Sequence, residues 1–234
     1  MHRLRDRQSA AQTGATVRPH AGDCRSTLNT QRFELVFQDE SLLIVNKPAG
    51  QLAVPGRGAD KQDCLSARIQ EIFPDALVVH RLDMATSGLL AFARGAAMQR
   101  CLSMMFQRRE IEKRYVAVCA GQMEQDSGEI ALPLAIDWPN RPKSKVDFTL
   151  GKPSLTRYRV LDILENQSRL ALEPVTGRTH QLRLHLAAIG HPILGDALYG
   201  DAHSAPRLLL HACALAFRHP ASGVSLRFEH AAPF

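Results

Sequence analysis

Short apolar runs separated by polar turns dominate the chain from residue 33 onward. Runs rich in Val, Ile, Leu and Phe and bounded by Gly, Pro, Asp or Asn are typical of β-strands. The pattern predicts strands over residues 33–37, 42–45, 77–79, 88–92, 115–119, 154–163, 168–174, 207–217 and 224–228, the first two joined by a hairpin turn at 38–41.

Three other segments, residues 65–73, 95–109 and 178–189, carry apolar residues at the spacing of a helix. We expect Asp63 to cap the start of the first helix and Gly190 to close the third, which we interpret as amphipathic. Many strands and three helices without a regular β-α-β alternation predict an α+β fold, built on a mixed, mostly antiparallel sheet with flanking helices.

Residues 1–32 differ from the rest of the chain. They hold six arginines and two aspartates among small and polar residues, and their few apolar residues follow no period. Such a segment cannot bury an apolar face, so we predict a disordered basic N-terminal extension followed by one domain over residues 33–234. The extension also resembles a mitochondrial transit peptide, but it lacks the apolar stretch of a secretory signal.

Composition excludes several classes of protein. Hydrophobic residues make up 45% and charged residues 22%, which is an ordinary globular balance. The longest apolar runs are far shorter than the roughly 20 residues that cross a bilayer, so we expect no membrane association. The five cysteines lie far apart, which argues against a zinc ribbon or a disulfide scaffold and favours a reducing compartment, the cytoplasm.

The formal net charge is +6, and basic residues cluster within residues 100–114 and 140–159. Either cluster could be a solvated face or a contact for a polyanion such as RNA. Nucleotide-binding glycine motifs, H-E-x-x-H and G-x-S-x-G are all absent from the sequence. His180 and His185 are five residues apart, which would place them on different helix faces. We therefore predict no cofactor and no metal, although separated histidines could still converge in space.

The strongest local signal is a polar turn between two apolar strands, at residues 78–88. Asp83 in this turn has two interpretations. Its carboxylate could bond the main-chain amides of Ala85 or Thr86 and only stabilise the turn. It could instead be an ionised group presented for chemistry, because loops at the ends of rigid elements often carry catalytic residues.

Residues 80–88, His-Arg-Leu-Asp-x-x-Thr-Ser-Gly, resemble the signature of the RluA family of pseudouridine synthases, and the likeness extends from Phe33 to Phe234. It implies the pseudouridine synthase fold, without the S4 RNA-binding domain of many relatives, and an isomerase that converts uridine to pseudouridine. Further motifs of the family follow in order at residues 46–50, 113–117, 177–185, 195–200 and 208–212.

The resemblance also implies roles for individual residues. Asp83 would be the catalytic carboxylate, acting on the sugar, on the base or on the C2′ proton, and Arg183 would be its salt-bridge partner. Without the resemblance, Arg183 would be a surface arginine of an amphipathic helix. The target nucleotide must leave the RNA stack, with Arg81 filling the space that it vacates. Tyr115 would stack on the flipped base and assist deprotonation at C5, and Leu182 would contact the uracil.

Candidate RNA contacts lie in and near the second basic cluster. Arg141, Lys143, Lys145 and, from the family motif, Arg178 are candidates for phosphate contacts, and Trp138 is either a stacking platform or a core residue. Residues 137–143 resemble a dual-specificity member of the family. That member modifies a hairpin of 23S rRNA and the anticodon stem-loop of certain tRNAs, which makes structured RNA the expected partner.

Three alternatives remain at this stage. The chain could be a non-catalytic RNA-binding or ribosome-assembly factor that keeps the fold. It could be a synthase of the same family with a single, different RNA target. A metal-dependent hydrolase that uses the histidines is the third. No feature of the sequence demands more than a monomer.

Overall fold

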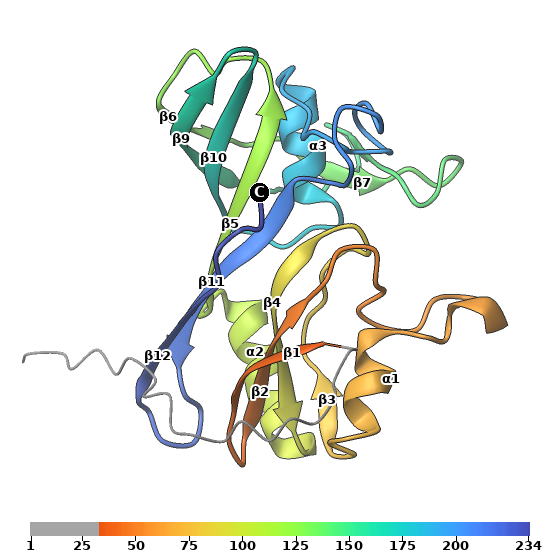
Figure 1. Cartoon of the computed structure of the whole chain (residues 1–234), viewed down its shortest axis with the longest axis vertical. Helices are drawn as coiled ribbons and strands as arrows, with labels where there is room; N and C mark the ends of the chain where they lie inside the picture. Colours follow the sequence, from red (N-terminus) through yellow and green to blue (C-terminus); the bar gives the residue numbers. More distant parts are fainter. Residues whose placement is uncertain (1–32) are drawn as a thin grey trace, which may run out of the picture.

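The computed structural model describes residues 33–234; the predicted N-terminal extension, residues 1–32, lies outside the described residues. A ten-stranded sheet runs through the molecule in the order β1-β2-β4-β11-β5-β10-β9-β6, with β3 paired to β4 and β12 to β11 (Figure 1). β7 and β8 form a separate two-stranded hairpin. The strands are β1 (Glu34–Gln38), β2 (Leu42–Lys47), β3 (Ala76–Val78), β4 (Ser87–Arg94), β5 (Glu112–Ala120), β6 (Ser127–Ile130), β7 (Leu134–Ile136), β8 (Ser144–Val146), β9 (Thr156–Leu164), β10 (Gln167–Pro174), β11 (Leu210–Arg218) and β12 (Ser225–Glu229). The helices are α1 (Leu65–Gln70), α2 (Ala96–Arg108) and α3 (Gln181–Ala188), with a 3-10 turn at Ala59–Lys61.

The half of the sheet that contains β2 and β4 is buried on both faces. Leu43 of β2 belongs to an apolar cluster that includes Leu65 of α1, whereas its neighbour Ile44 belongs to a cluster that includes Leu102 of α2. Successive side chains of a strand point to opposite faces, so α1 and α2 cover opposite faces of this half (Figure 1). This double burial explains why β2 and β4 are nearly continuous apolar runs.

The other half of the sheet, with β5, β10 and β9, packs against α3. Leu170 and Leu172 of β10 share an apolar cluster with Leu182 and Leu186 of α3. β11 lies between β4 and β5 and joins the two halves (Figure 1). α3 and this half of the sheet therefore form one wall of the region in which the loop before β4 meets the loop before α3.

Gly88 permits the parallel contact between β4 and β11 at the centre of the sheet. Its φ is +118°, and a Cβ atom there would lie 2.4 Å from the Ala212 carbonyl oxygen and 2.5 Å from the Ala212 nitrogen. Only glycine fits such an approach between two backbones. The turn that holds Asp83 is thereby fixed directly before the start of a buried strand.

The structure confirms the α+β class and the mostly antiparallel sheet, in which β4 and β11 are the parallel pair among the described strands. Gly190 closes α3 with a φ of +87°, as predicted. None of the helices within residues 33–234 is long and apolar enough to cross a membrane.

Two helix starts differ from the prediction. The N-cap of α1 is Cys64 rather than Asp63, because Asp63 instead binds Arg68 through both carboxylate oxygens, at 2.7 and 2.6 Å. α3 begins at Gln181 rather than at residue 178, because the preceding residue, His180, has a left-handed backbone with φ 56°. The helix is also not amphipathic, since every residue from 181 to 186 is buried.

The sequence pattern did not predict β6, β7 or β8, and it began β11 three residues too early. These three strands have only three or four residues each, and segments such as Ser-Gly-Glu-Ile at 127–130 contain no apolar run. Their pairing is set by neighbouring strands and not by a local signal.

Candidate active site

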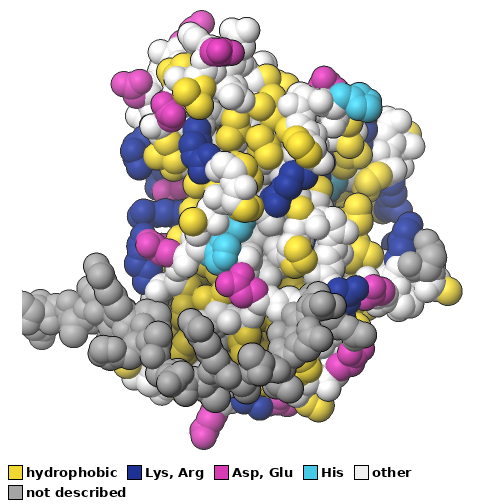
Figure 2. Space-filling model, viewed as in Figure 1, with side chains coloured by type: hydrophobic (Ala, Val, Ile, Leu, Met, Phe, Trp, Pro, Cys, Tyr) yellow, Lys and Arg dark blue, Asp and Glu magenta, His cyan; other side chains and the backbone are white. Residues whose placement is uncertain are grey.

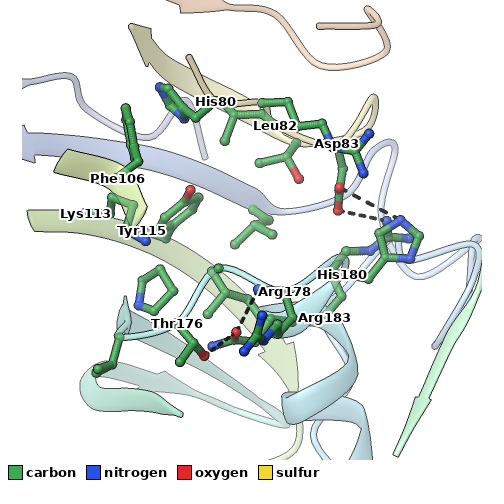
Figure 3. Close-up of a pocket in the computed structure, with 18 of the residues that line it drawn as sticks. His80, Leu82, Asp83, Phe106, Lys113, Tyr115, Thr176, Arg178, His180 and Arg183 are labelled. Atoms are coloured by element: carbon green, nitrogen blue, oxygen red, sulfur yellow. Dashed lines mark hydrogen bonds and ion pairs between the residues drawn. The ribbon is translucent and has the colours of Figure 1, made fainter. Parts of the chain in front are cut away.

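A cavity of about 550 Å³ opens between the loop before β4 and the segment before α3 (Figure 3). Residues 80–83 form one side, residues 174–183 form the other, and Lys113 and Tyr115 of β5 lie between them. The cavity lies within the range of roughly 300–1,000 Å³ that is usual for small-molecule sites. Its walls come from segments that are far apart in the sequence, and they also include Phe106 of α2 and Leu210 of β11.

Asp83 projects into this cavity from its loop (Figure 3). Its Oδ2 lies 3.4 Å from Nη1 of Arg183, and its Oδ1 lies 3.9 Å from Nε2 of His180. The main chain closes the turn, since the Thr86 amide donates to the Asp83 carbonyl oxygen. The Asp83 side chain is 26% exposed. The carboxylate therefore faces a cation and the open cavity, whereas the turn-capping interpretation placed it on the local backbone.

Arg183 is held more tightly by a second carboxylate than by Asp83. Its Nε and Nη2 donate to the two oxygens of Asp196 at 2.8 and 2.6 Å. Burial alone would lower the pKa of Arg183, but the hydrogen bonds and charge of Asp196, aided by Asp83, raise it. Burial would likewise raise the pKa of Asp196, and the Arg183 guanidinium outweighs that effect and lowers it. Both groups are charged in the folded protein.

Lys47 anchors the main chain of the Asp83 loop by hydrogen bonds. This fully buried side chain donates from Nζ to three carbonyl oxygens, those of Pro48, Gln51 and Met84, at 2.8 to 3.1 Å. Burial lowers the pKa of Lys47 to about 8, and the negative charge of Asp83 offsets part of this shift. Because Met84 follows Asp83 directly, the three bonds fix the position of the catalytic candidate relative to the end of β2.

Tyr115 and Leu182 provide apolar surface in the cavity. Tyr115 packs against the apolar clusters of both halves of the sheet, and Leu182 is only 6% exposed. Burial, with a further contribution from the charge of Asp83, raises the pKa of Tyr115, so its phenol stays protonated at neutral pH. The ring offers an aromatic face and a hydroxyl group to the cavity.

His80 has a structural role, as its apolar setting predicts. Its Nε2 accepts the Ala91 amide at 2.9 Å, and its ring stacks on Phe106 at 4.2 Å. Burial lowers the pKa of His80 to about 3, so the ring is neutral and serves as a hydrogen-bond acceptor. His211 is buried, and its Nδ1 is hydrogen-bonded to Ser87 Oγ at 2.8 Å.

Basic side chains surround the cavity. Arg81, Arg109, Lys113 and Arg178 all line it, and Arg81 and Arg178 are exposed. The face of the molecule seen in Figure 2 mixes basic and acidic side chains, so the excess positive charge is not one continuous patch there. The concentration of cations around the cavity suits a polyanion that enters it.

The β7–β8 hairpin forms a second surface next to the cavity. Trp138 is 65% exposed, so it is not a core residue, and the Arg141 guanidinium lies 3.3 Å from the centre of its ring. Trp138, Lys145 and Arg178 line a second cavity of about 520 Å³. Arg178 lines both cavities and joins them. Lys143 lies in the loop of the same hairpin.

The basic stretch of residues 140–159 does not form one surface. Arg157 lies on β9 and pairs with Glu129 at 2.8 Å and with Glu173 at 3.8 Å, so it belongs to the ten-stranded sheet and not to the β7–β8 hairpin. These basic residues are close in sequence, but the turn between β8 and β9 separates them in space.

Sequence reasoning gave no role to three residues of the site, His180, Asp196 and Tyr199. The hydroxyl of Tyr199 bonds His180 Nδ1 at 2.8 Å and accepts the Ser144 amide at 2.7 Å. Two of the three lie in the motif at residues 195–200, whose match to the family was a usable signal. Within the described part of the chain, no group of histidine, cysteine or carboxylate side chains could hold a metal ion.

Comparison with known proteins identifies close relatives. Residues 41–188 match the family model described as RNA pseudouridylate synthase. The dual-specificity RNA pseudouridine synthase RluA of Escherichia coli (strain K12) is 48% identical over 204 residues, which cover 86% of this chain and 93% of the relative. The RluA of Haemophilus influenzae is 45% identical over 206 residues, 86% of this chain and 94% of the relative.

Solved structures agree with this relationship. Human RNA Pseudouridylate Synthase Domain Containing 1 matches with a TM-score of 0.73 at 27% identity, over 88% of this chain and 85% of that one. Human RNA Pseudouridylate Synthase Domain Containing 4 has the same fold, with a TM-score of 0.70 at 23% identity over 86% and 88% of the two chains. The chain belongs to the RluA family of RNA pseudouridine synthases, isomerases that convert uridine to pseudouridine.

Proposed function

We propose that this protein isomerises uridine in two classes of structured RNA, a hairpin of 23S rRNA and the anticodon stem-loop of tRNA. The observation that carries the proposal is the Asp83 carboxylate, partly exposed in the cavity and 3.4 Å from Arg183. Relatives with 45 to 49% identity are named dual-specificity enzymes, which supports two classes of target. We further propose that the protein acts as a cytoplasmic monomer.

The reaction breaks the N1–C1′ bond of uridine, rotates the uracil and joins C5 to C1′. The proton on C5 is lost and N1 gains one, so atoms balance without an oxidant, a reductant or a group donor. Asp83 supplies an anionic oxygen, which can attack C1′, add to the base or take the C2′ proton. Each course requires a charged carboxylate with access to the nucleoside, and the Arg183 guanidinium stabilises that charge.

A uridine within a stacked loop cannot reach the cavity, so the nucleotide must flip out of the RNA at a cost of about a few kcal/mol. Arg81 is exposed beside Asp83, in position to occupy the space that the base leaves. Tyr115 offers an aromatic face to the flipped uracil, and Leu182 offers an apolar contact. The hydroxyl of Tyr115 also assists the loss of the C5 proton, the role that the family resemblance implies for it.

The β7–β8 hairpin is the proposed RNA-binding surface, which we call the RNA grip. Trp138 can stack on an unpaired base, and Arg141, Lys143, Lys145 and Arg178 can contact phosphates. Lys145 is also paired with Asp147 at 3.1 Å, which holds its side chain over the hairpin. Arg178 lines both cavities, which supports a path for the RNA from the hairpin to the cavity that holds Asp83.

The test uses purified protein with two synthetic RNAs, a 23S rRNA hairpin and a tRNA anticodon stem-loop, in a chelator and without nucleotide. Carbodiimide adducts that block reverse transcription report pseudouridine. Product in both RNAs supports the proposal, and product in only one reduces it to a single-target enzyme. RNA binding without product in either RNA would support a non-catalytic factor and overturn the proposal. Mapping pseudouridine in cells that lack the protein then identifies the natural sites.

A further inference from the structure

Asp196 is the buried carboxylate nearest to the reaction centre that the proposed chemistry does not use. It lies 13 residues after Arg183 in the sequence, in the loop that follows α3, and it is fully buried. Its Oδ1 also accepts the amides of Leu198 at 2.9 Å and Tyr199 at 3.2 Å. A buried carboxylate with this many donors is fixed in place and keeps its charge.

One guanidinium therefore serves two carboxylates unequally. Asp196 receives the paired Nε and Nη2 donors of Arg183 at 2.8 and 2.6 Å, the geometry of a bidentate ion pair. Asp83 receives only Nη1, at 3.4 Å. The Arg183 guanidinium also lies 5.3 Å from the centre of the Tyr199 ring, so the same loop contacts it from a second direction.

This unequal division has a consequence for Asp83. If Asp196 did not occupy the paired donors, Arg183 could turn them to Asp83 and bind it through two bonds. Asp83 would then be sequestered as half of a tight ion pair and would lose access to the ribose. A single, longer contact stabilises the charge of Asp83 and leaves the carboxylate available to the substrate.

We propose that Asp196 is a positioning residue for the isomerisation, which anchors Arg183 through two bonds so that Arg183 offers only one donor to Asp83. The inference rests on the proposed function of Asp83. It assigns a role to the motif at residues 195–200. Gly195 makes the loop possible, because its φ is +72° and a Cβ atom there would lie 2.0 Å from the Arg207 carbonyl oxygen.

The first experiment compares wild type with Asp196→Asn, which has nearly the same shape but no negative charge. Single-turnover rates at saturating RNA measure the chemical step, and filter binding measures RNA affinity. We expect the rate to fall on the order of 100-fold, because a misplaced catalytic group costs about that much, with an unchanged Kd. Asp196→Glu restores the charge and should recover part of the rate.

A double-mutant cycle with Arg183→Lys shows whether Asp196 acts through Arg183. The lysine lacks the fork that Asp196 binds, so Asp196→Asn should cause little further loss in the Arg183→Lys background. Asp75→Asn is the matched control. It removes the partner of Arg94, at 3.1 Å, in an ion pair outside the cavity, and should leave the rate unchanged.

A wild-type rate in folded Asp196→Asn, or losses that multiply in the double variant, would overturn the proposal. If Asp196→Asn does not fold, the same cycle is measured with Asp196→Glu. It shows whether the rate losses of the Asp196 and Arg183 variants are coupled, as proposed, or multiply as for independent residues. An inactive wild type would overturn the proposed function itself, so the two failures are distinguishable.

Discussion

The Asp83 cavity and the β7–β8 hairpin differ in almost every physical respect. Around Asp83, the charged groups Lys47, Arg183 and Asp196 are buried and each makes at least three hydrogen bonds. On the hairpin side, Trp138 is 65% exposed, and Phe148 in the turn after β8 is 80% exposed. The first region is fixed by its own network, whereas the second presents aromatic and basic side chains that have few protein partners to hold them.

The difference indicates that the two regions have separate functions, catalysis in the cavity and RNA binding at the hairpin. Chemistry at C1′ requires a charged oxygen held within a fraction of an ångström, which only a satisfied buried network provides. RNA loops vary in shape, and exposed stacking and phosphate-binding side chains can adapt to more than one of them. The proposed activity on two classes of RNA would require a rigid cavity combined with adaptable RNA contacts.

The strongest prediction concerns Asp83. Asp83→Asn should lower the single-turnover rate by about 10⁴-fold or more, the loss typical of removing a catalytic nucleophile or base. Asp162→Asn, at an exposed position of β9, is the matched control and should keep the wild-type rate. A folded Asp83→Asn variant that produces pseudouridine at one tenth of the wild-type rate would disprove the role of this carboxylate.

Arg183→Lys should have the next largest effect, a loss of about 100-fold in the rate at saturating RNA. Lysine keeps the positive charge but cannot donate to Asp196 and Asp83 together in the same geometry. The control is Arg94→Lys, which alters the exposed pair with Asp75. Equal rates for the two variants would show that the fork of Arg183 is unimportant.

The grip is tested by Trp138→Ala, alone and with Arg141→Ala. Loss of one stacked base weakens binding by about 1–3 kcal/mol, so the Kd should rise roughly tenfold or more while the rate at saturating RNA is unchanged. Leu164→Ala removes a similarly exposed apolar side chain at the end of β9 and should leave the Kd unaltered. An unchanged Kd in the Trp138 variant would remove the hairpin from the RNA contact.

The last effect concerns stability rather than activity or RNA affinity, and it belongs to the buried region. Burial lowers the pKa of His80 to about 3 and that of His211 to about 4, well below the usual 6.5. Below pH 6.5 the unfolded chain binds protons that the folded chain does not, so the free energy of unfolding falls as pH drops. The slope approaches about 1.4 kcal/mol per pH unit for each such histidine.

Urea unfolding between pH 7 and pH 5 measures this slope above the range in which carboxylates titrate. His80→Gln should make it shallower, because glutamine does not titrate. A free energy of unfolding that is constant from pH 7 to pH 5 in the wild type would contradict the assignment of these buried, neutral rings.

Local patterns predicted most of the fold. The apolar runs of β2 and β4 and the helical spacing of α2 are strong signals, because each element buries its own apolar residues. Local sequence patterns gave the wrong helix start where contacts with other residues, or an unusual backbone conformation, determine the structure. Asp63 has the composition of an N-cap, but Arg68 binds it, and the left-handed backbone of His180 delays α3.

Most of the site, like most of the fold, was predictable from the sequence. The family motifs identified Asp83, Tyr115 and Arg183, and the structure brings all three to one cavity. The role of Asp196 depends on a bidentate contact across a loop, which no pattern of sequence spacing encodes. Residue types thus pointed to the chemistry, whereas the way one guanidinium is divided between two carboxylates required the three-dimensional structure.

The central claim is that catalysis and RNA binding reside in separate regions of the molecule. The most direct test measures the rate and the Kd with the same RNA for two variants, Asp83→Asn and the Trp138→Ala, Arg141→Ala double variant. We predict that Asp83→Asn binds RNA like wild type and reacts about 10⁴-fold more slowly or slower still, and that the double variant binds weakly yet reacts at the wild-type rate once saturated. A rate for Asp83→Asn near one tenth of wild type or above, or a slow reaction of the saturated double variant, would contradict the account.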